Sequence, residues 1–549
     1  MVDLSDCDRE PIHIPGTIQP FGVLFALDEE MNVTQVSGNV SDHLSLGVDQ
    51  VLGRPLSAIV DPAGAEEVRS VLRDQRWHEA NPLSIGACGK RFDGIVHHHA
   101  GAAILELEPN AETPEERSVH HPFRAALLRV QRATALSELA QIITQEIRRT
   151  TGFERVMFFR FHEDGSGSVD AEARDAAHEP YLGLHYPASD IPAQARRLYL
   201  ENWLRLIFDA DQQPAPIVPA LRPDTGAPLD LSFSVLRSVS PVHIAYMKNM
   251  GVRASMSISL IVRNQLWGLI SCLNHTGPRR VSHRMRSACE FIGRLASLQI
   301  AAFEDRDLGA VRASHRPTQD ALHRAMKEAA GSVLAALVAQ PEALLDLVDA
   351  GGAAVLENGE PVTCGAVPPA GVMGQIARWL DERGDLRPFA SAALGADFPP
   401  ALAASDVASG LLTFPLPGGR LMWFRPELIQ TVNWGGDPTK PAEAEAGKPL
   451  RPRHSFALWK EEVRGRSRPW TPGDLEAADE LQRRATEADI GRRLSSEQRA
   501  VRARDEMLAV VSHDLGTPCP SSCSQPLTSW STCRRRATSA PPHCASPWS

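Results

Sequence analysis

The chain has 549 residues, of which 43% are hydrophobic and 23% charged, as in globular proteins of roughly three or four domains. A formal charge of −10 argues against nucleic acid or an anionic membrane as the main partner. No apolar run approaches about 18 residues, and the start MVDLSDCDREPIHIPG lacks the basic and apolar regions of a signal peptide. We therefore expect a cytoplasmic protein with free thiols, and no membrane or nucleic-acid partner.

The first segment, residues 1–115, alternates short apolar runs such as FGVLFALDEE and MNVTQVSGN with turn residues. This pattern predicts an antiparallel sheet with a few helices. A polar, proline-containing stretch, EPNAETPEERS, then forms a linker that ends near Ser118.

The second segment, residues 119–305, opens with a helical pattern around Leu127 to Ile147. Strand-like runs follow at RVMFFRF, SMSISLIV and QLWGLISCL. A long helical stretch from about His283 to Phe303 closes the segment, with apolar residues at helical spacing. We therefore expect a second domain that is also α+β.

The third segment, residues 306–500, contains a further helix, weak strands and a stretch rich in Gly and Pro from Thr431 to Leu450. After Thr471 the sequence becomes an amphipathic helix, rich in Glu and Arg, that runs to about Val511. We expect this helix to dock against a second copy of itself, giving a homodimer.

The last 31 residues, 519–549, differ abruptly from the rest. They hold four of the nine cysteines, eight serines and five prolines, but no Asp, Glu, Ile, Val or Phe. Such a composition cannot form a core, so we expect disorder. Natural disordered tails are usually charged and poor in Cys and Trp, which indicates an aberrant or out-of-frame sequence here.

Polar residues cluster at three places in the second segment. HYPASDIPAQARRLY, His185 to Tyr199, places Asp190 just before a helix whose first position suits Pro192. A second cluster runs from Ser234 to Ser259, and QLWGLISCLNHTGPRRV carries a strand into His275. Taken singly, a Ser-Asp-x-Pro is more often a helix cap and a lone histidine more often a core residue. Together they predict a pocket with apolar walls and a few convergent polar groups.

At these residues the sequence resembles the phytochrome family, from about Cys7 to Trp470. CDREPIHIPGTIQPFG resembles the bacteriophytochrome N-terminus, and PASDIPAQARRLY the signature of the chromophore-binding GAF domain. WGGDP and PRHSF resemble the start and the tip of the PHY-domain tongue. The resemblance implies tandem PAS, GAF and PHY domains joined by a helical spine, a tongue at about 431–465, and an N-terminal lasso knot with Ile18 near the crossing.

The resemblance also implies the pigment. Plant and cyanobacterial phytochromes attach their bilin to a cysteine immediately before the histidine that matches His243. Val242 stands there in this chain and cannot form a thioether. Cys7 matches the bacterial attachment site, so covalently bound biliverdin IXα is implied. The alternative is that Cys7 is an idle N-terminal thiol.

Residue roles follow from the same resemblance. The backbone carbonyl of Asp190 would meet the pyrrole N–H groups, and His243 would hydrogen-bond near the same nitrogens. Propionate contacts would come from Arg and Ser side chains, three tyrosines would pack around the ring that isomerises, and His275 would meet that ring's carbonyl. The implied cofactor-binding set is Cys7, Tyr186, Asp190, Ile191, Pro192, Tyr199, Arg205, Arg237, Ser240, His243, Tyr246, Ser255, Ser257 and His275; no metal or catalytic residue is expected.

Two departures from the family pattern lie near the isomerising ring. Phe159 stands where the family usually has Tyr, so one hydroxyl is missing. The family's Cys-His-His is replaced by Cys272-Leu273-Asn274-His275. A one-residue insertion, followed by realignment at Thr276, leaves His275 as the expected partner of the ring carbonyl.

EMLAVVSHDLGTP, within residues 501–518, resembles the phosphoacceptor box of sensor histidine kinases, with His513 in the acceptor position. No second acceptor helix or nucleotide-binding segment follows, so His513 is expected to be a vestigial acceptor or simply an exposed histidine.

The implied function is red/far-red light sensing. Asp190 would exchange partners with Arg453 or Ser455 of the tongue, and the spine would carry the change onward. The alternatives are a light-regulated kinase and a light-independent sensor of another small molecule.

Overall fold

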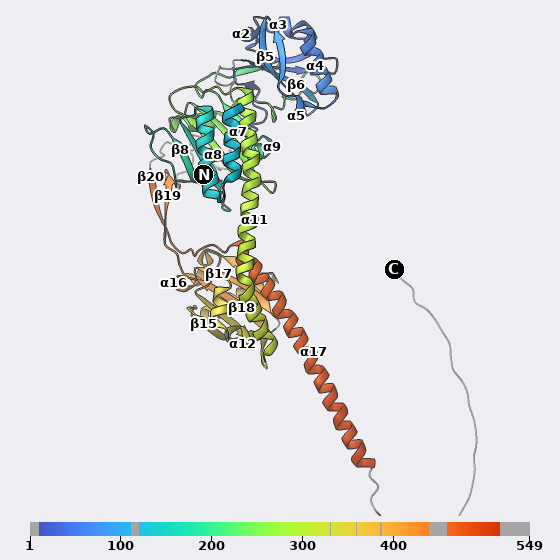
Figure 1. The fold of residues 1–549 in the computed structure, drawn as a ribbon, viewed down its shortest axis with the longest axis vertical. Coiled ribbons are helices and arrows are strands. Elements are labelled where there is room, and N and C mark those ends of the chain that lie inside the picture. The colour runs from blue at the N-terminus through green and yellow to red at the C-terminus, as the bar shows by residue number, and fades with distance from the viewer. Residues whose placement is uncertain are drawn as a thin grey trace, which may run out of the picture. The chain divides into compact units, whose positions relative to one another are not determined.

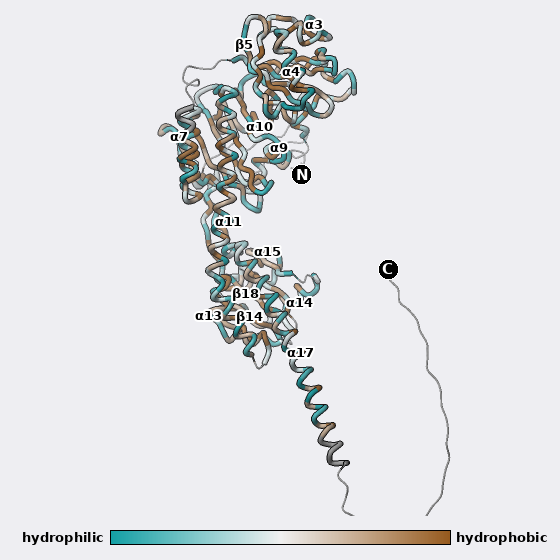
Figure 2. The backbone as a smooth tube through the Cα atoms, turned by 45° about the vertical axis from the view of Figure 1, so that its right-hand side comes forward, coloured by the Kyte–Doolittle hydropathy of each residue, from teal (hydrophilic) through white to brown (hydrophobic). Residues whose placement is uncertain are grey.

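A computed structural model describes residues 10–110, 120–329, 331–357, 359–384, 387–416, 418–438 and 458–516. Contacts divide the chain into two units, Met1–Gln482 and Arg483–Ser549. The first unit contains three sheets, each with its own helices (Figure 1). Hydrophobic residues gather inside these three parts, whereas much of the C-terminal helix α17 (Pro472–Gly516) is hydrophilic (Figure 2).

The first sheet has seven strands in the order β1-β11-β3-β2-β6-β5-β4. They are β1 (Thr17–Ile18), β2 (Val23–Leu27), β3 (Val33–Ser37), β4 (Leu83–Ala87), β5 (Lys90–His99), β6 (Ala102–Pro109) and β11 (Ala215–Val218). Apolar side chains of α4 (Pro62–Arg73), such as Val68 and Val71, are buried in the same cluster as the strand residues Phe25 and Val36. The antiparallel sheet with a few helices predicted for this segment is confirmed.

The N-terminal segment contacts the second domain on both sides of Ile18. Ile18 pairs with Ala215 of β11 on one edge and forms an isolated bridge to Arg237 on the other. The side-chain amide of Gln19 donates hydrogen bonds to the carbonyls of Leu206, at 3.0 Å, and Arg237, at 3.2 Å. The segment therefore passes between two stretches of the second domain; that it is threaded as a lasso knot stays a prediction.

The second sheet has eight strands in the order β10-β12-β13-β7-β8-β9-β19-β20. Its first six are β7 (Arg155–Phe161), β8 (Gly167–Arg174), β9 (His185–Tyr186), β10 (Leu204–Ile207), β12 (Ala254–Val262) and β13 (Gln265–Asn274). All three strands predicted from apolar runs are present, as β7, β12 and β13. Their alternation buries Ile270 and Cys272 in one cluster and Leu269 and Leu273 in another on the opposite face.

The helices of the second domain differ from the sequence expectation in their limits. The expected helix at Leu127 to Ile147 is interrupted: α7 (His120–Arg132) ends before α8 (Leu136–Thr151) begins. At the break, the backbone N–H and hydroxyl of Thr134 both donate to the carboxylate of Glu138 in the first turn of α8, at 2.8 and 2.9 Å. The expected helix from His283 is confirmed but continues past Phe303 as α11 (His283–Glu328).

The third sheet has five strands in the order β15-β14-β18-β17-β16. They are β14 (Gly352–Glu357), β15 (Glu360–Gly365), β16 (Phe389–Ser391), β17 (Gly410–Leu416) and β18 (Gly419–Arg425). Its helices include α12 (Val333–Val338), α13 (Pro341–Asp346) and α14 (Ala370–Glu382). Buried Asp474 and Arg425 form an ion pair at 2.9 Å, which ties the start of α17 to β18.

A hairpin from the third domain extends the second domain's sheet. Its strands, β19 (Gln430–Gly435) and β20 (Leu458–Val463), are antiparallel, and Trp434 pairs in parallel with His185 of β9. Figure 1 shows the hairpin reaching the second domain beside β8. This hairpin will be called the tongue; its tip, 439–457, lies outside the described residues and holds Arg453 and Ser455.

Candidate functional site

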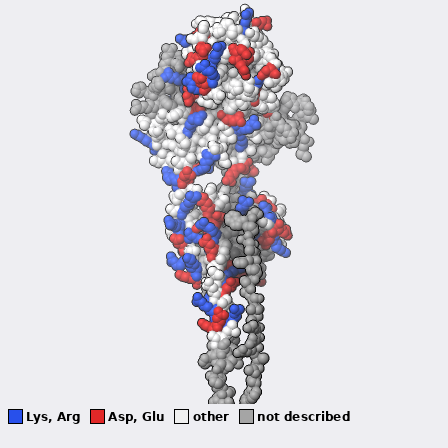
Figure 3. Space-filling model, turned by 90° about the vertical axis from the view of Figure 1, so that its right-hand side faces the viewer, with Lys and Arg blue, Asp and Glu red and all other residues white. Residues whose placement is uncertain are grey.

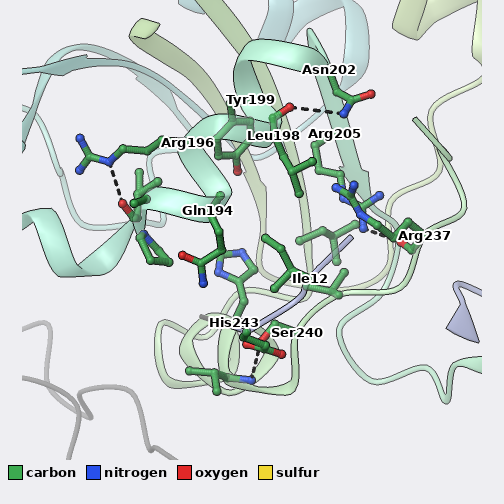
Figure 4. A pocket seen from close by; sticks show the side chains of 18 of the residues that line it. Ile12, Gln194, Arg196, Leu198, Tyr199, Asn202, Arg205, Arg237, Ser240 and His243 are labelled. Carbon is green, nitrogen blue, oxygen red and sulfur yellow. Dashed lines mark hydrogen bonds between the residues drawn. The ribbon is translucent and has the colours of Figure 1, made fainter. Parts of the chain in front are cut away.

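A cavity of about 650 Å³ opens in the second domain. Its walls come from the helical turn Ala188–Asp190, from α9 (Ala193–Glu201) and α10 (Pro241–Asn249), from β10, and from residues 233–240. Glu10 and Ile12 of the N-terminal segment complete the lining. Two of the three sequence clusters predicted to form a pocket, at 185–199 and 234–259, thus meet at one cavity (Figure 4).

Asp190, Ile191 and Pro192 all line the cavity at the entrance to α9. Pro192 is the N-cap of α9, one position earlier than the sequence suggested. Arg196, one turn into the helix, donates hydrogen bonds back to the carbonyls of Ile191, at 2.8 Å, and Gly165, at 2.5 Å. Arg196 therefore fixes the backbone that presents Asp190 to the cavity.

The hydroxyl of Tyr246 donates a hydrogen bond to Oδ2 of Asp190 across 2.9 Å. Tyr246 lies on α10, and its ring stacks with that of His243 at a centroid distance of 6.0 Å. The contact thus connects the two sequence clusters, 56 residues apart, across the cavity.

Two arginines lie together at one side of the cavity, Arg205 on β10 and Arg237 on the segment between β11 and α10 (Figure 4). In the described part of the chain their hydrogen-bond acceptors are backbone carbonyls, including Val235 for Arg205 and Ser232 for Arg237, and none is a carboxylate. Burial, with the neighbouring charge of Arg237, lowers the pKa of Arg205 to about 9, and burial also lowers the pKa of Arg237. Both side chains still carry charge at neutral pH, so the cavity has a positive wall.

His243 lines the cavity, where desolvation favours the neutral form of its imidazole. Burial, and secondarily the charge of Arg205, lower its pKa from 6.5 to about 4. The imidazole is therefore neutral at physiological pH, and can donate one hydrogen bond and accept another.

Ser240 begins α10 as its N-cap, and its hydroxyl accepts a hydrogen bond from the backbone N–H of Val242 at 3.2 Å. Both Ser240 and Val242 line the cavity. Val242 stands where the sequence resemblance places the cysteine of plant and cyanobacterial phytochromes. At this position the chain therefore presents an aliphatic side chain to the cavity.

Tyr199 lines the cavity, whereas Tyr186, Ser255 and Ser257 do not. Tyr186 is buried beside the cavity wall, with its ring 6.0 Å from that of Phe159. Ser255 and Ser257 are buried on β12, paired in register with Ile207 and Arg205 of β10. Their contact with a ligand stays a prediction.

His275 lies away from the cavity lining. It follows the end of β13, its Nδ1 is 3.0 Å from the carbonyl oxygen of Gly251, and its ring is 4.4 Å from that of His178. Leu273 instead lies in the apolar cluster that contains Phe159 and Tyr186. Strand pairing runs through Leu273 and Asn274, so His275 lies beyond the strand, and the structure does not bring it to the predicted ligand contacts that line the cavity.

Comparisons with known proteins agree across the chain. The PAS fold model matches residues 7–110, the GAF domain model residues 135–302, and the phytochrome region model, PHY, residues 315–493. Cyanobacterial phytochrome B of Nostoc is 41% identical over 535 residues, which cover 94% of this chain and 71% of that protein. A bacteriophytochrome of Xanthomonas campestris is 36% identical, over 87% of this chain and 78% of that protein.

The wild-type phytochrome photosensory core module of Stigmatella aurantiaca is a solved structure with 44% identity and a TM-score of 0.81. The match covers 89% of this chain and 99% of that one. The chain belongs to the phytochrome family. Its predicted fold class, tandem PAS, GAF and PHY domains of mixed helix and antiparallel sheet, is confirmed, and the cavity lies in the phytochrome GAF domain.

Several predicted residues of this phytochrome fall outside the described part of the chain. These are Cys7, the tongue residues Arg453 and Ser455, and the side chain of His513, whose backbone continues α17. No helix in the described ranges is both long and apolar enough to cross a bilayer. Within the same ranges, no cluster of three or more His, Cys, Asp or Glu side chains is arranged to hold a metal ion.

Sequence reasoning missed two residues that shape the phytochrome cavity. Arg196 secures the Asp190 backbone, and its position one turn after Pro192 was a usable signal. Glu10 lines the cavity from a segment 230 residues away from its partner Ser240. Only the folded chain brings these two together, so no spacing in the sequence could have revealed the pair.

Proposed function

We propose that this chain is a red/far-red photoreceptor whose GAF cavity binds biliverdin, joined to the protein by a thioether at Cys7. The observation that carries the proposal is the positive wall formed by Arg205 and Arg237. Buried guanidinium groups without a carboxylate partner favour an anionic ligand, and a bilin carries two propionates.

The remaining lining fits the same ligand. A cavity of about 650 Å³ is within the range used for small-molecule cofactors. Aliphatic and aromatic residues such as Ile12, Leu198 and Tyr199 offer apolar walls, while neutral His243 offers both a donor and an acceptor for polar ring atoms. Val242 cannot form a thioether, which favours Cys7 and therefore biliverdin.

The cavity residues hold and orient the bilin in this proposal, and Asp190 links the cavity to the tongue. Light absorption and double-bond isomerisation are chemistry that the bilin supplies when bound. Arg205 and Arg237 hold carboxylates, and Arg196 keeps the Asp190 backbone aimed at the cavity. Asp190, held by Tyr246 in this structure, exchanges that hydrogen bond for Arg453 or Ser455 in the tongue. The tongue and the spine helices α11 and α17 then carry the change onward.

A homodimer fits the exposed apolar side chains of α17. Ile490, Leu494, Val501 and Leu508 are between 49% and 60% exposed, and the last three recur every seven residues. Such a stripe matches the a positions of a coiled coil with a second copy. Sedimentation equilibrium of the parent and of Val501→Glu tests this assembly.

The proposed attachment is tested by incubating apoprotein with biliverdin and separating it on a denaturing gel with zinc. The parent should show bilin fluorescence at its own band, and Cys7→Ser should lose it while keeping some non-covalent pigment in solution. Fluorescent labelling that survives Cys7→Ser would refute the attachment site. A parent that gains no visible absorption band would instead favour a light-independent sensor of another molecule.

On the face shown in Figure 3, Lys and Arg alternate with Asp and Glu rather than forming a patch of one sign. This distribution supports a small-molecule sensor over a nucleic-acid-binding protein. We also propose that the matched PAS, GAF and PHY domains do not themselves transfer phosphate, because a phosphoryl transfer to His513 requires a nucleotide site that positions the γ-phosphate.

A further inference from the structure

The first described residue of the N-terminal segment, Glu10, contacts the cavity wall through a side-chain hydrogen bond. The hydroxyl of Ser240 donates to Oε2 of Glu10 across 2.8 Å. Ser240 is the N-cap of α10, Glu10 is the first described residue of the chain, and both line the cavity. The bond therefore joins the chain's start to the helix that carries His243.

The direction of this hydrogen bond is fixed by its neighbours. A Ser hydroxyl has one proton, and the Ser240 oxygen already accepts from the backbone N–H of Val242 at 3.2 Å. The Glu10 carboxylate can only accept, so the Ser240 hydroxyl donates its one proton to Glu10. A hydrogen bond to a charged acceptor is among the stronger kinds, which suits a contact that holds residue 10 at the cavity wall.

The segment after Glu10 has a separate anchor. The carbonyl of His13 accepts a hydrogen bond from the backbone N–H of Leu231 at 2.8 Å, and Ile12 N–H donates to the Glu10 carbonyl at 2.8 Å in a tight turn. These backbone contacts hold residues 12–14 whatever side chain stands at position 10. The Glu10 carboxylate therefore adds a separate contact at residue 10, which these backbone bonds do not supply.

Cys7 precedes Glu10 by three residues, a length of chain that spans at most about 10 Å. We propose that Glu10 is a positioning residue for chromophore attachment: its hydrogen bond to Ser240 holds the N-terminal segment at the cavity, so that the Cys7 thiol reaches a vinyl group of bound biliverdin. This inference rests on the proposed function. The inference adds to that function that Glu10, which is not itself a bilin ligand, controls the rate of chromophore attachment.

The covalent step needs no oxidant or reductant. The sulfur of Cys7 forms a bond to one vinyl carbon, the carbon–carbon π bond breaks, and the thiol proton ends on the bilin. The product has the combined composition of thiol and pigment. Holding the two groups close makes the step effectively unimolecular, so losing the tether lowers its rate without removing either reactant.

The test compares Glu10→Ala, Glu10→Gln and the parent, with Glu29→Ala as a control that removes an exposed carboxylate elsewhere. Apoprotein is mixed with biliverdin at several concentrations. Absorption reports total binding, and zinc fluorescence on denaturing gels at successive times reports the covalent fraction. The two readouts separate the half-saturating concentration from the limiting rate of attachment.

Glu10→Ala should lower the limiting attachment rate by about tenfold or more, and change the half-saturating concentration by less than about threefold. Glu10→Gln, whose amide oxygen still accepts from Ser240, should restore most of the rate. An Ala variant that attaches at the parent's rate would overturn the inference, and so would a Gln variant as slow as Ala. Failure of the parent to attach biliverdin at all would instead contradict the proposed function.

Discussion

The hydroxyl of Tyr246 donates to Oδ2 of Asp190 at 2.9 Å, and this contact joins the entrance of α9 to α10. Asp190 precedes α9, whose backbone is secured by Arg196, while Tyr246 lies on α10 next to His243. In the proposed mechanism Asp190 exchanges this hydrogen bond for one with the tongue, so its carboxylate would report the state of the cavity to the PHY domain.

Tyr246→Phe should lengthen the life of the photoproduct. The substitution keeps the ring and its stacking on His243 but removes the donor to Asp190, so it weakens the state in which α10 holds the carboxylate. Biliverdin binding should survive. Absorption decay in darkness after red light measures the lifetime, and a photoproduct that decays faster than the parent's would contradict the assigned role.

Removing the positive wall should abolish a preference for free propionates. The parent should bind biliverdin at least about tenfold more tightly than biliverdin dimethyl ester, because the ester cannot pair with Arg205 and Arg237. The double variant Arg205→Gln/Arg237→Gln should bind both pigments within about threefold of each other. Titration by absorption checks this, with Arg69→Gln as an exposed control. Equal affinities in the parent would refute a propionate site.

A side chain at position 435 should loosen the tongue. A Cβ placed on Gly435 would lie 2.8 Å from Cε1 and 2.9 Å from Cζ of Tyr186, a buried ring that has little room to move. Gly435→Val should therefore speed proteolysis of the tongue in the apoprotein, whereas Thr431→Ala, exposed on the same strand, should not. Equal cleavage rates in Gly435→Val and the parent would show that the close approach does not hold the hairpin.

The neutral His243 should make the apoprotein less stable in acid. Its pKa is lowered from 6.5 to about 4 by burial, so between these values the unfolded chain binds a proton that the folded chain does not. Stability present above about pH 6.5 is lost as the pH falls toward 4. Urea unfolding at about pH 7.5 and about pH 5 should show a smaller difference for His243→Gln than for the parent. The exposed His78→Gln should leave the difference unchanged.

Local pattern was enough to predict the strands β7, β12 and β13 and the helix that starts at His283. Apolar periodicity determines such elements because each has one face to bury. The interruption between α7 and α8 is accompanied instead by hydrogen bonds from Thr134 to Glu138, which leave the apolar periodicity almost unchanged.

Two features of the tertiary structure could not be predicted from the sequence: the position of His275 and the contact of the tongue with the GAF sheet. The position of His275 depends on where the β12–β13 pairing stops, and that pairing runs through Leu273 and Asn274. The tongue joins the GAF sheet through a parallel contact between Trp434 and His185, which are distant in the sequence. No repeat or residue spacing in the sequence indicates either feature.

The most direct test of the account is a set of absorption spectra of purified protein with biliverdin, recorded in darkness, after red light and after far-red light. The account predicts a far-red band that changes under one colour and returns under the other over repeated cycles. A biliverdin complex whose spectrum is the same in all three conditions would contradict it.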